Sequence, residues 1–197
     1  MAKRLFDLLA AGAGLLLLAP LFAVIAVWIR LDSPGPVFFR QQRVGRPGVP
    51  FRIHKFRTMT HAPAAAGLPL TVGADARVTR AGRLLRRTRL DELPQLIDVL
   101  AGTMSLVGPR PEVPRYVAFY PPELRAKVLG VRPGITDPAS LLNLDEAEVL
   151  GRAADPERAY VEIVLPAKLR CSARYVDERS LGGDLRLIAR TLRAVLR

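Results

Sequence analysis

The chain opens with an uninterrupted apolar segment. No charged residue lies between Leu8 and Ile29, while Asp7 and Arg30 stand at its two borders. These 22 residues match the roughly 20 that a helix needs to cross the hydrocarbon core of a bilayer. A secretory signal peptide is disfavoured, because its apolar core has about 7–15 residues and ends at small side chains. This run instead ends in Val27-Trp28-Ile29. The pattern predicts a membrane anchor over residues 1–32.

The path of this anchor has two interpretations. As one straight helix, the run would cover about 33 Å, which is enough to cross the bilayer. Pro20, preceded by Ala19, lies near its middle, where proline removes a backbone hydrogen bond and bends a helix. Lys3 and Arg4 precede the run and a basic body follows it, so a bent, re-entrant segment would keep every cation on the cytoplasmic side. A mildly kinked spanning helix is equally compatible with the residues.

Residues 33–197 predict a second, small domain with a core of its own. Alternating apolar positions predict a short β-hairpin, with strands at 37–40 and 51–56 around a turn at 44–48. Residues 60–75 are rich in Ala, Gly and Pro and predict a mobile loop. Apolar residues at helical spacing predict a mainly helical remainder, in which amphipathic basic helices suit a membrane surface. The expected helices lie at 78–89, 93–100, 113–119, from 122 onward, and 184–197. The fold class is α+β.

The charge and cysteine content narrow the function classes. The formal net charge is +12, and the isoelectric point near 11.1 favours an acidic partner: anionic lipid, nucleic acid or a phosphorylated small molecule. A single cysteine, Cys171, excludes a disulfide framework and a cysteine-based zinc site. His54 and His61 have no metal-ligating partners at useful spacing.

Candidate chemistry is concentrated at two adjacent carboxylates, Asp91 and Glu92. They stand next to Arg86, Arg87 and Arg89 and just before Pro94. The ordinary interpretation makes Asp91 the N-cap of the following helix. The functional interpretation is a phosphate and Mg²⁺ site, because a helix N-terminus with arginines attracts anions and Mg²⁺ prefers carboxylate and phosphate oxygens. A carboxylate beside a bound phosphoryl group is also a competent nucleophile.

Three further segments carry fixed or clustered cations. Arg110 lies between Pro109 and Pro111, so its backbone is stiff and its guanidinium can be held at low entropic cost. Lys55 and Arg57 follow a predicted strand, and Arg132 opens a turn with Pro133-Gly134. Each segment has a plain structural interpretation on its own, as a rigid loop, a strand end or a turn.

Together, the order and spacing of four segments resemble a known family. The chain is similar to the bacterial sugar transferases of the small monotopic phosphoglycosyl transferase type, over nearly its whole length. The segments that carry the resemblance are Lys55-Phe56-Arg57-Thr58-Met59, Leu90-Asp91-Glu92-Leu93-Pro94-Gln95, Met104-Ser105-Leu106-Val107-Gly108-Pro109-Arg110-Pro111-Glu112 and Arg132-Pro133-Gly134-Ile135-Thr136.

The resemblance implies a reaction and a set of roles. Such enzymes transfer a sugar 1-phosphate from a nucleoside diphosphate sugar, usually a UDP-sugar, to polyprenyl phosphate such as undecaprenyl phosphate, and release UMP. It implies Asp91 as the nucleophile and Glu92 as the second catalytic carboxylate and Mg²⁺ ligand. The other implied roles are phosphate and nucleotide contacts by Arg86 and the Pro109-Arg110-Pro111 loop, pocket or headgroup contacts by Lys55, Arg57 and Arg132, and a membrane-helix break at Ala19-Pro20, where the family often has Ser-Pro.

The resemblance also implies a location and partners. The expected location is the bacterial inner membrane. The anchor would be re-entrant, and the catalytic domain would lie on the cytoplasmic face, in contact with anionic lipid. No nucleic-acid partner is expected, and a homodimer is compatible with the sequence. Two rivals are a membrane-tethered binder of anionic lipid or nucleic acid, which would not need Asp91, and a non-catalytic membrane scaffold. The sugar and the glycan pathway stay open.

Overall fold

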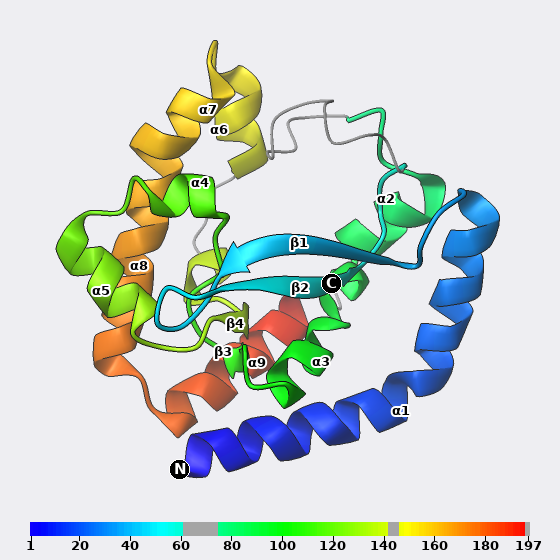
Figure 1. Cartoon of the computed structure of the whole chain (residues 1–197), viewed down its shortest axis with the longest axis horizontal. Helices are drawn as coiled ribbons and strands as arrows, with labels where there is room; N and C mark the ends of the chain where they lie inside the picture. The colour runs from blue at the N-terminus through cyan, green and yellow to red at the C-terminus, as the bar shows by residue number, and fades with distance from the viewer. Residues whose placement is uncertain (61–74, 142–145, 196–197) are drawn as a thin grey trace.

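The computed structural model describes residues 1–60, 75–141 and 146–195. It confirms a mainly helical α+β fold with a long apolar N-terminal helix and small sheets (Figure 1). Residues 61–74, on which most of the predicted 60–75 loop falls, lie outside the described residues.

The anchor is one continuous helix, α1 (Ala2–Asp32), with Pro20 inside it. Figure 1 shows that α1 changes direction partway, running beneath the body and then up beside it. An internal proline accounts for a bend of this kind. Among the described residues, α1 alone is long and apolar enough to cross a bilayer. Its exposed apolar side chains, which suit contact with lipid, are Leu5, Leu9, Leu16, Leu17, Leu21, Val24, Val27, Trp28 and Leu31.

Both ends of α1 are bonded to the same body. Near the start, Lys3 Nζ donates to Asp184 Oδ2 over 2.6 Å, and Ser105 Oγ donates to the buried Asp7 Oδ2 over 2.8 Å. At the other end, the Ala81 amide donates to Asp32 Oδ2 over 3.0 Å. Hydrogen bonds to charged partners are stronger than neutral ones, so these contacts fix the direction of the helix at each end.

The predicted hairpin is confirmed as β1 (Phe38–Val44) and β2 (Pro50–Phe56), an antiparallel pair in which Phe38 faces Phe56. The Phe56 ring stacks on Phe38 at 5.5 Å and meets Phe22 of α1 edge-on at 5.2 Å. The hairpin therefore packs against the second half of the anchor through aromatic contacts.

The central segment contains the two adjacent carboxylates, Asp91 and Glu92. It contains α2 (Arg80–Arg87), the 3₁₀ helix η1 (Leu90–Glu92) and α3 (Gln95–Leu100). A second small sheet pairs β3 (Ser105–Val107) in parallel with β4 (Gly134–Thr136). α3 packs against α1 and β2 through a cluster of Ala11, Ile53, Leu96, Val99 and Met104.

The C-terminal part builds a separate helical core. The tyrosines Tyr116 and Tyr160, with ring centroids 4.7 Å apart, lie in a buried cluster with Val44, Val164 and Leu169. The predicted helices near 113–119, from 122 and at 184–197 are confirmed in kind. The elements are α4 (Pro114–Val117), α5 (Pro122–Leu129), the 3₁₀ helix η2 (Pro138–Leu141), α6 (Glu146–Arg152), α7 (Pro156–Ala159), the π-helix η3 (Tyr160–Val164), α8 (Leu165–Glu178) and α9 (Leu181–Val195).

Candidate active site

The carboxylate pair lies on a tight turn between α2 and α3. Arg89 adopts a left-handed backbone conformation with φ 57°, which reverses the chain after α2 and starts the 3₁₀ turn that holds Asp91 and Glu92. Both residues are buried, at 8% and 7% exposure. The N-cap interpretation of Asp91 is wrong: Pro94 occupies the N-cap position of α3, and no side chain caps that helix.

Glu92 is held by two cations from different elements. Lys55 Nζ, at the end of β2, donates to Glu92 Oε1 over 2.6 Å. Both Nη atoms of Arg110 donate to the same carboxylate, Nη2 to Oε1 and Nη1 to Oε2, the latter over 3.3 Å. Burial alone would raise the pKa of Glu92, yet the charges of Arg110 and Lys55 outweigh it and hold this pKa far below its usual value. Glu92 is therefore a permanent anion that positions two cations.

Asp91 differs from its neighbour. Across the part of the chain that the structure describes, no hydrogen bond or ion pair reaches the Asp91 carboxylate. Burial raises the pKa of Asp91, and the charge of Lys55 opposes this rise. Neither Asp91 oxygen is among the fully buried, unpaired polar atoms of the described residues, so the carboxylate opens to the surface, and ionisable groups with a shifted pKa gather where chemistry is performed. Its oxygens remain uncommitted and available to a reacting group.

The loop that carries Arg110 is anchored on both sides. Before it, the Gly134 amide of β4 donates to the Pro109 carbonyl over 3.0 Å. After it, Arg43 Nη1 donates to the Pro111 carbonyl over 3.0 Å, and the Val44 amide donates to the Glu112 carbonyl over 2.9 Å. These bonds, with the two prolines, fix where the guanidinium points.

Arg43 and Tyr160, which hold the Arg110 loop in place through Glu112, were not predicted from the sequence. Arg43 Nη1 donates to Glu112 Oε1 over 3.3 Å, and Tyr160 donates to Glu112 Oε2 over 2.5 Å. They tie the Arg110 loop to β1 and to the helical core. Both lie far from the motif in sequence, and neither belongs to a recognisable pattern.

His54 bonds the strand that carries Lys55 to α3. Asp98 of α3 accepts from the His54 amide over 2.8 Å, and its other oxygen lies 2.7 Å from His54 Nδ1. Since Lys55 follows His54 on β2, this double contact sets the spacing between β2 and the helix that follows the carboxylate pair.

The remaining predicted residues fall in three places. Arg86 lies beside the pair: its charge acts on Asp91, and its Nε donates to Thr58 Oγ1 over 2.9 Å. Arg57 is buried against the end of α1, where Nη2 donates to the carbonyls of Ile29 and Ser33. Arg132 donates to the Gly102 carbonyl over 2.8 Å, beyond the C-terminal end of α3. The structure thus brings Lys55, Arg86, Asp91, Glu92 and Arg110 together.

Comparison with known proteins agrees with this arrangement. The family model described as "Bacterial sugar transferase" matches residues 1–197. A UDP-N-acetylgalactosamine-undecaprenyl-phosphate N-acetylgalactosaminephosphotransferase of Aeromonas hydrophila is 38% identical over 196 residues, which cover 98% of this chain but 43% of that protein. A UDP-glucose:undecaprenyl-phosphate glucose-1-phosphate transferase of Caulobacter vibrioides is 39% identical over 98% of this chain and 69% of its own length.

A third relative is closer in length. The uncharacterized sugar transferase EpsL of Bacillus subtilis is 39% identical, over 98% of this chain and 87% of its own. The matches span the anchor, the carboxylate pair and the Arg110 loop alike. The chain belongs to the bacterial sugar transferase family.

Proposed function

We propose that the chain transfers a sugar 1-phosphate from a UDP-sugar to undecaprenyl phosphate, releasing UMP and forming a lipid-linked diphosphate sugar. This would be the first membrane step in the assembly of an exopolysaccharide or another glycoconjugate. The names of the Aeromonas and Caulobacter relatives support the substrate classes. The observation that carries the proposal is the uncommitted, buried Asp91 carboxylate beside the doubly paired Glu92.

The geometry suits a reaction in two steps. In the first, an Asp91 oxygen attacks the β-phosphorus of the UDP-sugar, and the bond from that phosphorus to the bridging oxygen breaks, so UMP leaves with this oxygen. In the second, a phosphate oxygen of undecaprenyl phosphate attacks the same phosphorus, and the bond to Asp91 breaks. Phosphoryl transfer depends mainly on positioning and charge stabilisation, which Arg110, Lys55 and Arg86 provide.

We also propose that Mg²⁺ binds at the carboxylate pair together with the diphosphate. Among the described residues, no group of three or more metal-ligating side chains is present, so the substrate would supply most ligands, as is common for Mg²⁺. Glu92 Oε2, which receives only the 3.3 Å contact from Arg110, retains lone pairs for this. When bound, the ion would neutralise charge on the phosphate oxygens.

The decisive experiment is release of UMP by the purified chain from a panel of UDP-sugars, with undecaprenyl phosphate and Mg²⁺ present. We expect release of UMP with at least one UDP-sugar. Release of more than one UMP per enzyme molecule should require undecaprenyl phosphate. Absence of release across the panel would refute the proposed function, and the pattern of accepted sugars identifies the donor.

Removing the Lys55 charge is expected to shift the pH dependence of this reaction. Asp91 must be ionised to attack, and Lys55 favours its ionised form. Lys55→Met therefore raises the pKa of Asp91 further. As the pH is lowered, the variant should lose activity at a higher pH than the wild type does, and its rate at neutral pH should be about 10²-fold lower. The measurement is a pH profile of kcat for UMP release. Lys55→Arg should keep the wild-type profile, and an unmoved acid limb in Lys55→Met would contradict this role.

The anchor is proposed to re-enter the cytoplasmic face of the bacterial inner membrane. α1 bends, and its two ends are bonded to one body through Lys3–Asp184 and Asp32–Ala81. Because that body is strongly basic, it belongs on the cytoplasmic side. A cysteine at position 2, in a Cys171→Ser background, is then expected to react with impermeant reagents only from the cytoplasmic side. Reaction from the outside alone would establish a spanning helix.

A further inference from the structure

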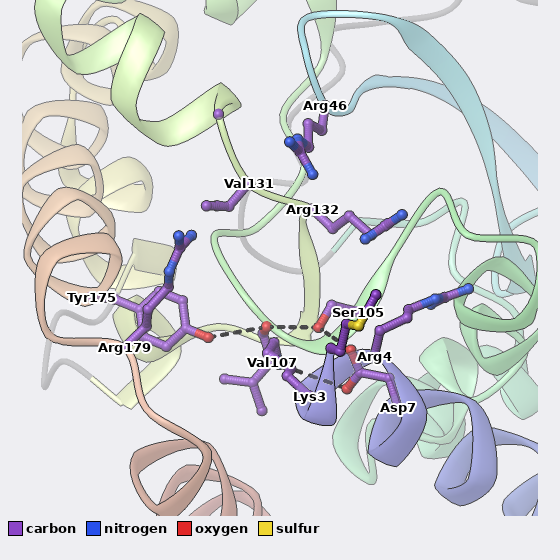
Figure 2. Close-up of a pocket in the computed structure, with 12 residues that line it drawn as sticks. Lys3, Arg4, Asp7, Arg46, Ser105, Val107, Val131, Arg132, Tyr175 and Arg179 are labelled. Carbon is purple, nitrogen blue, oxygen red and sulfur yellow. Dashed lines mark hydrogen bonds and ion pairs between the residues drawn. The ribbon is translucent and has the colours of Figure 1, made fainter.

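A cationic cavity lies at the start of α1, away from the carboxylate pair. Its volume is about 250 Å³, and it is lined by the start of α1, Arg46, β3, the segment 130–132 and the end of α8. Figure 2 shows the side chains of Arg46, Arg132 and Arg179 around this space, above Asp7 and Ser105. The volume is below that of pockets for drug-sized ligands, so it suits a small group.

The charge of this cavity is unbalanced. Among the described residues, its lining contains five cationic side chains, Lys3, Arg4, Arg46, Arg132 and Arg179, against a single carboxylate. That carboxylate, Asp7, and the neighbouring Asp184 are both engaged by Lys3. Within the described ranges, none of the four arginines forms an ion pair with a carboxylate. An anion entering the cavity would therefore meet several unneutralised guanidinium groups, whose fork geometry matches phosphate oxygens.

Exposed apolar side chains follow the cationic lining residues along the chain on two helices. On α1, Leu5 and Leu9 follow the cationic turn and are 60% and 65% exposed. On α9, which begins just after Arg179, Leu181, Leu185 and Leu192 are exposed as well. Such side chains enter the boundary between headgroups and acyl chains, and the neighbouring arginines then lie at the level of lipid phosphates.

The cavity is separate from the carboxylate pair. Arg132 is fixed to the Gly102 carbonyl after the C-terminal end of α3, whereas Glu92 precedes the N-terminal end of that helix. The six residues of α3 alone span about 9 Å. One ligand phosphate cannot serve both places.

We propose that this cavity binds the phosphate of an anionic phospholipid headgroup and so seats the N-terminal end of the anchor at the membrane surface. Its chemistry is that of a phosphodiester held by Arg46, Arg132 and Arg179, with the acyl chains lying along the exposed leucines of α1 and α9. The lipid is a structural ligand and not a reactant.

The test is selective lipid binding by the full chain in detergent, measured by native mass spectrometry without UDP-sugar. Phosphatidylglycerol and phosphatidylcholine with the same acyl chains are compared. We expect the wild type to retain phosphatidylglycerol preferentially, and Arg46→Gln/Arg179→Gln to lower its affinity roughly 30-fold, as expected for two lost cations near a lipid surface. Arg46→Lys/Arg179→Lys should keep most of the binding. Arg40→Gln/Arg170→Gln, two exposed arginines outside the cavity lining, is the matched control and should stay within about twofold.

Three results would overturn the proposal. The wild type could fail to discriminate between the two lipids, or the control pair could lose as much affinity as the cavity pair, which would indicate diffuse surface charge. Displacement of phosphatidylglycerol by equal concentrations of inorganic phosphate, glycerol phosphate or UMP would assign the cavity to a soluble anion. Because no turnover is measured, an inactive chain can still pass this test, and its outcome is independent of the proposed transferase activity.

Discussion

Asp91→Asn is expected to lower UMP release by about 10³-fold or more while leaving the protein folded and membrane-bound. The amide has nearly the same volume as the carboxylate but lacks the anionic oxygen that would attack phosphorus. Since no described residue bonds to the Asp91 carboxylate, its replacement disrupts no internal contact, and thermal stability should be unchanged or slightly raised as the cost of a buried charge disappears.

The measurement pairs initial rates of UMP release with detection of a covalent sugar-phosphate adduct in the absence of undecaprenyl phosphate. The wild type should accumulate the adduct and Asp91→Asn should not. Asp177→Asn is the matched control, because Asp177 is exposed and its only partner among the described residues is Lys127. Full turnover by Asp91→Asn would exclude Asp91 as the nucleophile. If the wild type binds anionic lipid but shows no transferase activity, the rival interpretation as a membrane-tethered binding module is favoured.

Glu92 shows what sequence alone could and could not predict at the site. The motif order indicated that Asp91, Glu92 and Arg110 act together, and the structure places all three side by side. Which cations neutralise Glu92 depends on how β2 and the 108–112 loop converge, and this is set by long-range contacts such as Arg43–Glu112. No local spacing encodes such contacts, so the sequence indicated only a pocket or headgroup contact for Lys55 and not its pairing with Glu92.

The N-cap error has a local cause. Pro94 suggested a helix starting close to Asp91, yet the left-handed Arg89 introduces a separate 3₁₀ turn before α3. A non-glycine residue with positive φ is uncommon and has no reliable sequence marker. The consequence matters for function, because a capping aspartate would have its oxygens occupied by backbone amides.

The second sheet was also beyond prediction. β3 and β4 have three residues each and pair in parallel across an intervening stretch that includes α4 and α5. Runs this short show no usable periodicity, and their pairing is decided by tertiary packing. The hairpin β1–β2 was predictable because both strands are longer and lie next to each other around a turn.

Gly134→Ala is expected to destabilise the protein by about 3 kcal/mol or more, the upper end of the cost of overpacking, because the backbone itself would have to move. A Cβ at this position would lie 2.0 Å from the Gly108 nitrogen and 2.6 Å from the Val107 carbonyl carbon. Neither neighbour is a flexible side-chain tip, so β3 and β4 would have to separate. The Gly134 amide also donates to the Pro109 carbonyl, and Arg110 would therefore lose its anchoring along with the fold.

The measurement is thermal unfolding in detergent together with the rate of UMP release, and both should collapse for Gly134→Ala. Gly151→Ala is the matched control: it lies in α6, and a Cβ there meets nothing within 4 Å, so it should be neutral or stabilise the helix by about 0.5–1 kcal/mol. Wild-type stability in Gly134→Ala would mean that β3 and β4 do not approach this closely. The glycine in the Arg132-Pro133-Gly134 turn is then required for packing, because only a residue without a side chain lets β4 lie close enough to β3 to hold the Arg110 loop against the carboxylate pair.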